Sequence, residues 1–189
     1  VNVIVCHLGN GSSISCVRGG KCVDTSMGTT PLQGVVMGTR CGDIDPAVLT
    51  YLGRTKGMNA DQLDNLINKQ SGLLGLSGIS NDCRVIEDGV AENNPACIRA
   101  MDVFVYRIVK YIGAYAAAMG GIDAIIFTAG IGENDYVARA MVCEPLKFMG
   151  IEIDPAKNDN KRDEGVISAD SSKVTVMVIP TNEELAIAK

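Results

Sequence analysis

Five short loops rich in glycine and turn-forming residues carry most of the polar side chains suited to chemistry, and each follows an apolar run or precedes a helix start. Glycine is favoured where the backbone turns sharply or approaches a ligand closely, and five such loops exceed what ordinary turns need. They predict a polyphosphate-binding site. The loops are His7–Ser13 (HLGNGSS), Gly38–Pro46 (GTRCGDIDP), Gly75–Arg84 (GLSGISNDCR), Phe127–Asn134 (FTAGIGEN) and Pro180–Glu184 (PTNEE).

The first loop has the composition of an anion-binding turn. Successive backbone N–H groups in a tight turn can converge on anionic oxygens, and the hydroxyls of Ser12 and Ser13 add donors. Asn10 offers an amide and tolerates left-handed backbone. Asn-Gly is also a common hairpin signal, so a plain β-turn is the alternative interpretation. His7, the only histidine of the chain, would by itself more often have a structural role.

Arg40 lies between two glycines, with Asp43 and Asp45 close behind it. A guanidinium suits bidentate binding of phosphoryl or carboxylate oxygens, and charge that develops on a transferred phosphoryl group needs such a partner. The alternative is a local ion pair of Arg40 with Asp43 or Asp45, while Asp45 caps the next helix.

The last two loops each follow a buried run. The segment Gly130–Asn134 superficially resembles a dinucleotide motif, but it lacks the third spaced glycine and a convincing acidic residue about 20 positions on, which argues against NAD. Glu183 and Glu184 are hard oxygen ligands of the kind that hold Mg²⁺. Alternatively, two glutamates in a first helical turn only complement the helix dipole.

The elements that must position these loops begin with strands and then alternate with helices. The first three strands form consecutive hairpins, and a glycine turn follows the fourth. The last strand leads Thr181–Glu184 into a helix start. This pattern predicts an α/β domain, in which residues 152–172 contain only small strands and loops. The expected strands are Val1–His7, Ile14–Val17, Lys21–Asp24, Asp123–Thr128 and Val174–Pro180. One expected helix starts at Asp45-Pro46, and the other three span Ala60–Gln70, Asn94–Met119 and Asp135–Val142.

Composition excludes several classes of protein. With 189 residues that are 47% hydrophobic, the chain is most simply one domain with its own core. A net charge of -5 without a basic cluster argues against nucleic acid. The longest apolar stretch, Ile108–Gly132, is interrupted by Lys110 and Asp123 and is not a membrane span. Seven cysteines without a C-x-x-C pair predict reduced thiols in a cytoplasmic protein. The missing initiator methionine leads us to expect a piece of a longer protein.

Together and in this order, the five loops closely resemble the acetate kinase family, over essentially the whole chain. That family belongs to the acetate and sugar kinase, Hsp70 and actin superfamily. The resemblance implies an actin-like ATPase (ribonuclease H-like) fold, with a mixed central sheet and a βββαβαβα core flanked by helices. It also implies that residues 1–189 are the C-terminal, nucleotide-binding domain and that the N-terminal domain is absent.

The resemblance further implies a role for each motif residue. On the phosphate side of the nucleotide cleft we expect His7, Leu8, Gly9, Asn10 and Gly11. At the adenosine end we expect Asp82, Cys83 and Arg84, although the family usually has a longer side chain where Cys83 stands. Around the adenosine and α-phosphate we expect Gly130, Ile131, Gly132, Glu133 and Asn134. The implied catalytic residues are His7, close to the transferred phosphoryl group, and Arg40, which stabilises the transition state, while Glu183 helps to hold Mg²⁺.

The implied reaction is reversible in-line transfer of the γ-phosphoryl group of ATP to acetate, giving acetyl phosphate and ADP. Because the family's first domain supplies the catalytic aspartate and the acyl-binding arginine, we expect the isolated chain to be inactive. The resemblance also implies that the full-length enzyme is a homodimer, as family members commonly are through this second domain. Two alternatives stay open: a propionate or butyrate kinase, and a non-catalytic actin-like module, which a helix in place of the loop Gly38–Asp45 would suit. The helix Asn94–Gly120 is either a core helix or a dimer surface.

Overall fold

The computed structural model describes residues 1–159 and 163–182, which form two compact units. The first unit contains Val1–Gly9, Ile14–Thr25 and Ile108–Lys189, and the second contains Asn10–Ser13 and Ser26–Arg107. The predicted site residues are therefore divided between two units, and Glu183 lies outside the described residues.

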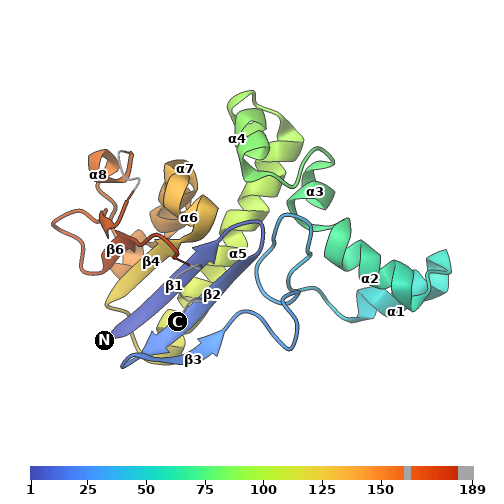
Figure 1. Ribbon diagram of the computed structural model, residues 1–189, viewed down its shortest axis with the longest axis horizontal. Coiled ribbons are helices and arrows are strands. Elements are labelled where there is room, and N and C mark those ends of the chain that lie inside the picture. The colour runs from blue at the N-terminus through green and yellow to red at the C-terminus, as the bar shows by residue number, and fades with distance from the viewer. Residues whose placement is uncertain (160–162, 183–189) are drawn as a thin grey trace. The chain divides into compact units, whose positions relative to one another are not determined.

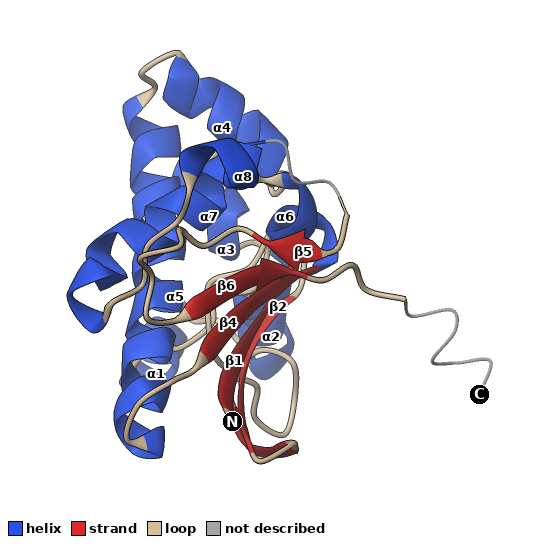
Figure 2. Ribbon diagram, turned by 90° about the vertical axis from the view of Figure 1, so that its left-hand side faces the viewer, coloured by secondary structure: helices blue, strands red, loops and turns tan. Residues whose placement is uncertain are grey.

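A mixed sheet with the strand order β3-β2-β1-β4-β6-β5 forms the base of the first unit (Figure 2). Strand β4 pairs in parallel with both β1 and β6, whereas β2–β3 and β5–β6 are antiparallel. A glycine pair, Gly19 and Gly20 at φ values of 57° and 79°, makes the tight turn of the β2–β3 hairpin. The strands are β1 (Asn2–Leu8), β2 (Ser12–Arg18), β3 (Lys21–Thr25), β4 (Ala124–Thr128), β5 (Gly165–Val166) and β6 (Thr175–Val178).

Alternating side chains of the parallel strands make the core of this unit. Apolar residues at every second position of a strand point to one face of the sheet, which here is covered by protein. Fully buried side chains on these strands are Ile4, Cys6, Leu8, Ile125, Phe127, Val176 and Val178. All seven cysteines are free and five of them are buried, in keeping with their expected role as small core residues.

The helices of the first unit follow β4 in sequence, after the long helix α5 (Pro95–Met119) that begins in the second unit. Helix α6 packs against β1 and β4. Side chains on α5 at Phe104, Ile108 and Ile112 are fully buried, which identifies α5 as a core helix. The other helices here are α6 (Ala129–Asn134), α7 (Tyr136–Cys143), the 3₁₀ helix η1 (Glu144–Met149) and α8 (Pro155–Asp159).

The expected glycine turn after β4 is wrong, because Ala129–Asn134 form helix α6. The chain reverses at Ala129, whose φ of 64° lies in the left-handed region. An added Cβ at Gly132 would lie 3.3 Å from the Phe127 carbonyl carbon and 3.5 Å from the Cys6 oxygen. The glycine therefore lets α6 approach the two strands closely, and this packing outweighs its poor helix propensity.

The second unit is helical apart from its loops (Figure 1). Asp45 accepts a hydrogen bond from the Ala47 N–H at 2.9 Å, and Asn94 accepts one from the Ala96 N–H at 2.9 Å, so both predicted helix starts are confirmed. The loop Gly38–Asp45 contains no helix or strand. The unit contains α1 (Ala47–Lys56), α2 (Ala60–Lys69), α3 (Gly72–Ser77), α4 (Cys83–Ala91) and the first part of α5.

The order β1-β2-β3, α5, β4, α7, β6 matches the first seven elements of the expected βββαβαβα core, and the expected eighth element lies outside the described residues. Helices α1 to α4 are inserted between β3 and α5. The α/β fold with a mixed sheet is thus as predicted. Among the described residues, no helix has the length and apolar character needed to span a membrane.

Candidate functional site

In the first unit, the carboxyl ends of three parallel strands bring predicted site residues together. His7 at the end of β1 is in register with Thr128 at the end of β4. The Thr128 and Thr181 hydroxyl oxygens lie 2.6 Å apart, and the Ala129 N–H donates to the Thr181 hydroxyl at 3.1 Å. The Glu133 carboxylate accepts a hydrogen bond from the Thr181 N–H at 2.8 Å. The loop after β6 is therefore fixed to the end of β4 and to helix α6.

The residues of helix α6 differ in their exposure to solvent. Gly130 and Asn134 are exposed, and the Asn134 amide donates to the Gly130 carbonyl at 2.8 Å. Gly132 is buried, as is the Leu8 side chain at the end of β1. Any contact that Leu8 makes with a ligand must therefore come from its backbone.

In the second unit, Asn10 from the first loop meets two other predicted loops. The Gly38 N–H donates to the Asn10 carbonyl at 3.1 Å, and the Asn81 amide donates to Asn10 Oδ1 at 3.2 Å. A Cβ added at Gly38 would collide with Asn10 Oδ1 and lie 3.0 Å from the Asn81 carbonyl oxygen. Only glycine leaves room for this arrangement, which holds the exposed Asn10 side chain in one orientation.

The Arg40 guanidinium lies beside Gly11. A Cβ built on Gly11 would be 3.5 Å from both Nη1 and Nη2 of Arg40. Arg40 Nη1 donates to the Pro31 carbonyl at 2.8 Å and contacts Met37 Sδ at 3.4 Å. The guanidinium is thus anchored at one nitrogen beside the backbone of the glycine turn.

The two aspartates behind Arg40 accept hydrogen bonds from backbone N–H groups, and the expected cap by Asp45 is confirmed. Asp43 Oδ1 accepts from the Gly34 N–H at 3.1 Å, and Asp45 Oδ1 caps α1. The ion pairs found among residues 1–159 and 163–182 do not include Arg40.

The segment at the start of α4 is organised by Asp82. One carboxylate oxygen accepts from the Arg84 N–H at 3.0 Å and from Nε at 3.1 Å, and the other accepts from Nη2 at 2.7 Å. These hydrogen bonds from Arg84 lower the pKa of Asp82. The Cys83 side chain is buried and lies 3.6 Å from Glu87 Oε1, whereas Arg84 is exposed. The Arg84 side chain, 86% exposed although paired with Asp82, is therefore the most solvent-accessible of the three.

The residues present fit an anionic ligand. A glycine turn, the Asn10 amide and the Arg40 guanidinium supply donors of the kind that bind phosphoryl oxygens, with glycine where a Cβ would fill the space. Thr128 and Thr181 anchor the loops, and the sequence patterns did not single them out. The sequence signal that would have identified them is a threonine at the end of one buried strand and another just after the end of the next.

Comparisons with known proteins agree with the motifs. Residues 1–189 match the model of the Acetokinase family. The chain is 58% identical over 186 residues to an acetate kinase of Phocaeicola vulgatus, an alignment that covers 98% of this chain and 47% of that protein. The chain spans about half the length of the curated relatives it matches.

Solved structures give the same result. The crystal structure of Porphyromonas gingivalis acetate kinase is similar with a TM-score of 0.95 and 51% identity, over 99% of this chain and 47% of that one. A propionate kinase from Francisella tularensis is similar with a TM-score of 0.94 and 44% identity, over 100% of this chain and 48% of that one.

Proposed function

This chain belongs to the Acetokinase family, and on that premise we propose that it is the C-terminal, nucleotide-binding half of an acetate kinase. The full-length enzyme would transfer the γ-phosphoryl group of ATP reversibly to acetate, giving acetyl phosphate and ADP. The observation that carries this proposal is the packing of Asn10, Gly11 and Arg40 in the second unit. It supplies an amide, backbone N–H groups and a guanidinium for phosphoryl oxygens, and none of these groups is a nucleophile.

Phosphoryl transfer requires positioning and charge stabilisation rather than a covalent intermediate on the enzyme. The Asn10 amide and the N–H groups of the glycine turn bind phosphate oxygens, and Arg40 balances the charge that develops on the transferred group. His7 lies close to that group, while Arg84 and helix α6 hold the adenosine end. Bound Mg²⁺ would neutralise the phosphate oxygens, with Glu183 as the proposed residue that holds it.

A propionate kinase is the second candidate, because the chain is 44% identical to the Francisella tularensis propionate kinase. In our proposal the acyl site lies mainly in the N-terminal domain. The isolated chain lacks that domain and is therefore inactive. Values of kcat/KM for acetate, propionate and butyrate, measured on the full-length enzyme, decide between the two. A non-catalytic actin-like module is disfavoured, since the Gly38–Asp45 segment is a loop that carries a positioned Arg40. The full-length enzyme would be a cytoplasmic homodimer.

A calorimetric titration of this chain with Mg-ADP, with NAD as the comparison ligand, tests the nucleotide site. Saturable binding of Mg-ADP without binding of NAD is the expected result, and binding of NAD alone would overturn the proposal. Binding of neither ligand would refute an independent nucleotide half and show that the site needs the N-terminal domain.

Substitution of Arg40 tests the proposed role in catalysis. In the full-length enzyme, Arg40→Ala should leave the Kd for Mg-ADP within about twofold and lower kcat by roughly a thousandfold or more, because its interaction is made in the transition state. Arg54→Ala, which removes an exposed arginine on α1 of the same unit, is the matched control. A large loss of Mg-ADP affinity would instead make Arg40 a ground-state phosphate ligand.

A further inference from the structure

We infer that Arg139 on α7 is a positioning residue for nucleotide binding, because its buried guanidinium fixes helix α6 in place. This inference rests on the proposed function, in which Gly130–Asn134 on α6 bind the nucleotide. Arg139 is outside every motif loop, and its side chain is fully buried. It makes no direct contact with the ligand in this proposal.

The first set of contacts joins Arg139 to the end of α6. Nη1 donates to the carbonyl oxygens of Gly132 at 2.9 Å and Glu133 at 2.8 Å. These carbonyls belong to the last turn of α6, where the backbone lacks the partners that a continuing helix would supply. A cation at this end also interacts favourably with the helix dipole. Arg139 therefore fixes both the position and the direction of the α6 carboxyl end.

The second set of contacts holds the guanidinium itself. Arg139 Nε donates to Asn158 Oδ1 at 2.8 Å, and Nη2 donates to the Asn158 carbonyl at 2.9 Å. The Asn158 amide in turn donates to the Tyr136 carbonyl at 2.8 Å, and Asn158 is only 3% exposed. A planar guanidinium satisfies acceptors on two sides at once, which the single ammonium of lysine cannot do. Arg139 thus ties α6 to α8 with defined geometry.

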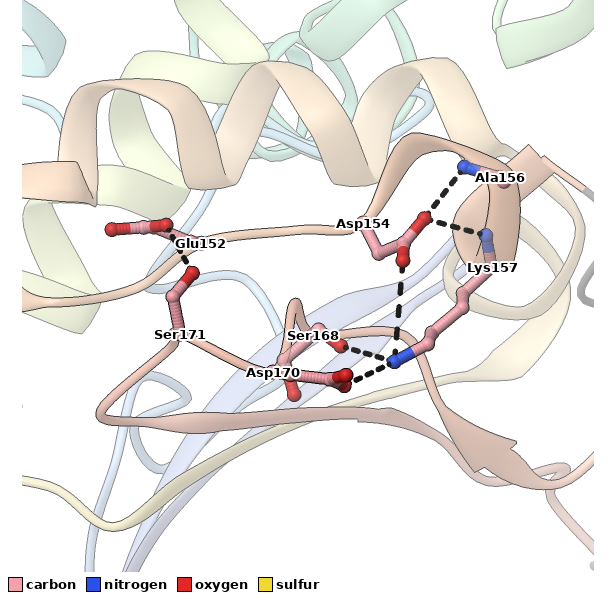
Figure 3. Close-up of polar contacts among 7 residues, drawn as sticks. All are labelled: Glu152, Asp154, Ala156, Lys157, Ser168, Asp170 and Ser171. Carbon is pink, nitrogen blue, oxygen red and sulfur yellow. Dashed lines mark hydrogen bonds and ion pairs between the residues drawn. The ribbon is translucent and has the colours of Figure 1, made fainter.

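Helix α8 is also secured at its outer side (Figure 3). Asp154 Oδ1 caps the helix by accepting from the N–H groups of Ala156 at 2.9 Å and Lys157 at 3.1 Å. Lys157 Nζ donates to Asp170 at 2.8 Å and to the Ser168 carbonyl at 3.3 Å. The Asp170 side chain is 98% exposed, so this ion pair contributes little to stability. It offers a control that loosens the outer side of α8 without touching Arg139.

The position of α6 affects two parts of the proposed site. Its residues Gly130–Asn134 are the proposed adenosine and α-phosphate contacts, and the Glu133 carboxylate holds the loop after β6 through the Thr181 N–H. Arg40, the proposed transition-state residue, belongs to the other unit. Displacement of α6 is therefore expected to weaken nucleotide binding and to leave the chemical step largely unchanged.

The test uses the full-length enzyme with Arg139→Lys, Asn158→Ala and the control Asp170→Asn. We expect Arg139→Lys to raise the KM for ATP by about tenfold, with kcat and the KM for the acyl substrate within about twofold of wild type. Asn158→Ala should raise the KM for ATP in the same direction by a smaller factor, because it removes one anchor of the guanidinium. Asp170→Asn should leave all three constants unchanged.

Thermal melting of each variant separates positioning from general stability. If Arg139→Lys lowers the melting temperature but leaves the KM for ATP unchanged, the residue is only structural and the inference fails. A fall in kcat at constant KM also overturns it. If Arg139→Lys does not fold, Asn158→Ala decides, and an unchanged KM for ATP in that variant refutes the inference. Failure of the wild-type enzyme to bind Mg-ADP would overturn the proposed function itself, whereas normal wild-type binding with unaffected variants would overturn only the role of Arg139.

Discussion

Substitution of Gly38 by alanine is a sensitive test of the Asn10 side chain as a phosphate donor. Gly38 is enclosed by Asn10 on one side and by the Asn81 carbonyl on the other. The new Cβ would collide with Asn10 Oδ1, the far end of an exposed side chain that can rotate away by breaking its hydrogen bond with Asn81, and would lie 3.0 Å from the Asn81 carbonyl oxygen. The backbone can accommodate alanine, so the collision and not backbone strain sets the effect.

The magnitude follows from the hydrogen bonds that a rotated Asn10 would lose. Its contact with the Asn81 amide, 3.2 Å long, contributes about 1 kcal/mol to stability at the usual net value. A hydrogen bond from the Asn10 amide to a charged phosphate oxygen contributes about 1.5 to 3 kcal/mol to binding. Since each 1.4 kcal/mol corresponds to about a tenfold change in affinity, Gly38→Ala should weaken Mg-ADP binding by roughly 10- to 100-fold.

A double-mutant cycle with Asn10→Ala checks the cause. Calorimetric Kd values for Mg-ADP are measured for Gly38→Ala, Asn10→Ala and the double variant of the full-length enzyme. Because alanine at position 10 removes the colliding atom, Gly38→Ala should cost much less in that background. The control Gly53→Ala, within α1, adds a Cβ that lies 3.5 Å from the Met58 carbonyl oxygen and should leave binding unchanged. An equal cost of Gly38→Ala in both backgrounds would refute the reasoning.

Three further predictions concern Glu133 and Asp82. Glu133→Ala removes the acceptor of the Thr181 N–H and should weaken Mg-ADP binding several-fold, whereas Glu133→Gln keeps an acceptor and should stay within about twofold; equal titration curves for the two variants would contradict this. Asp82→Ala removes the cap of α4 and should lower the free energy of unfolding in urea by about 1 kcal/mol, while Asp82→Asn preserves the cap; a loss as large for Asn would contradict the capping role. Because Arg84 holds the pKa of Asp82 below its ordinary value of 3.8, the stabilisation from this ion pair is complete above that pH and is lost as the pH falls through the folded-state value. Acid-unfolding curves of wild type and Asp82→Asn should therefore converge in that range, and a constant difference would show that the pair does not titrate as described.

Local signals in the sequence account for the hairpins and for the main helix starts. The glycine pair after β2 and the carboxylate or amide before Pro46 and Pro95 act over a few residues, and each has the predicted structure. The apolar face of α5 also predicts burial correctly, because its period places Ile108 and Ile112 on the same side. Asn59 and Gln62 form a capping box, a further local signal that marks the start of α2.

The remaining features depend on contacts between distant residues. Helix α6 contains two glycines in six residues, so its propensity indicates a turn, and only its packing against β1 and β4 makes it helical. Arginine side chains are usually exposed, so residue type alone predicts that Arg139 lies at the surface. Its position four residues before Cys143, on the same face of α7, is the one local indication that it is buried. Its partners Gly132 and Asn158 lie 7 and 19 residues away in the chain, and no local pattern specifies them.

In our proposal this acidic chain binds a polyphosphate, so its own carboxylates must not repel the ligand. Near the motif loops, Asp82 is paired with Arg84, and the Glu133 carboxylate accepts the Thr181 N–H. Asp43 accepts the Gly34 N–H. Each donor offsets part of the negative charge of the carboxylate that it binds. The carboxylates can therefore hold the loops in shape with less repulsion of an anion. We therefore expect the local arrangement of donors within each unit, and not the net charge of -5, to govern the proposed anion binding.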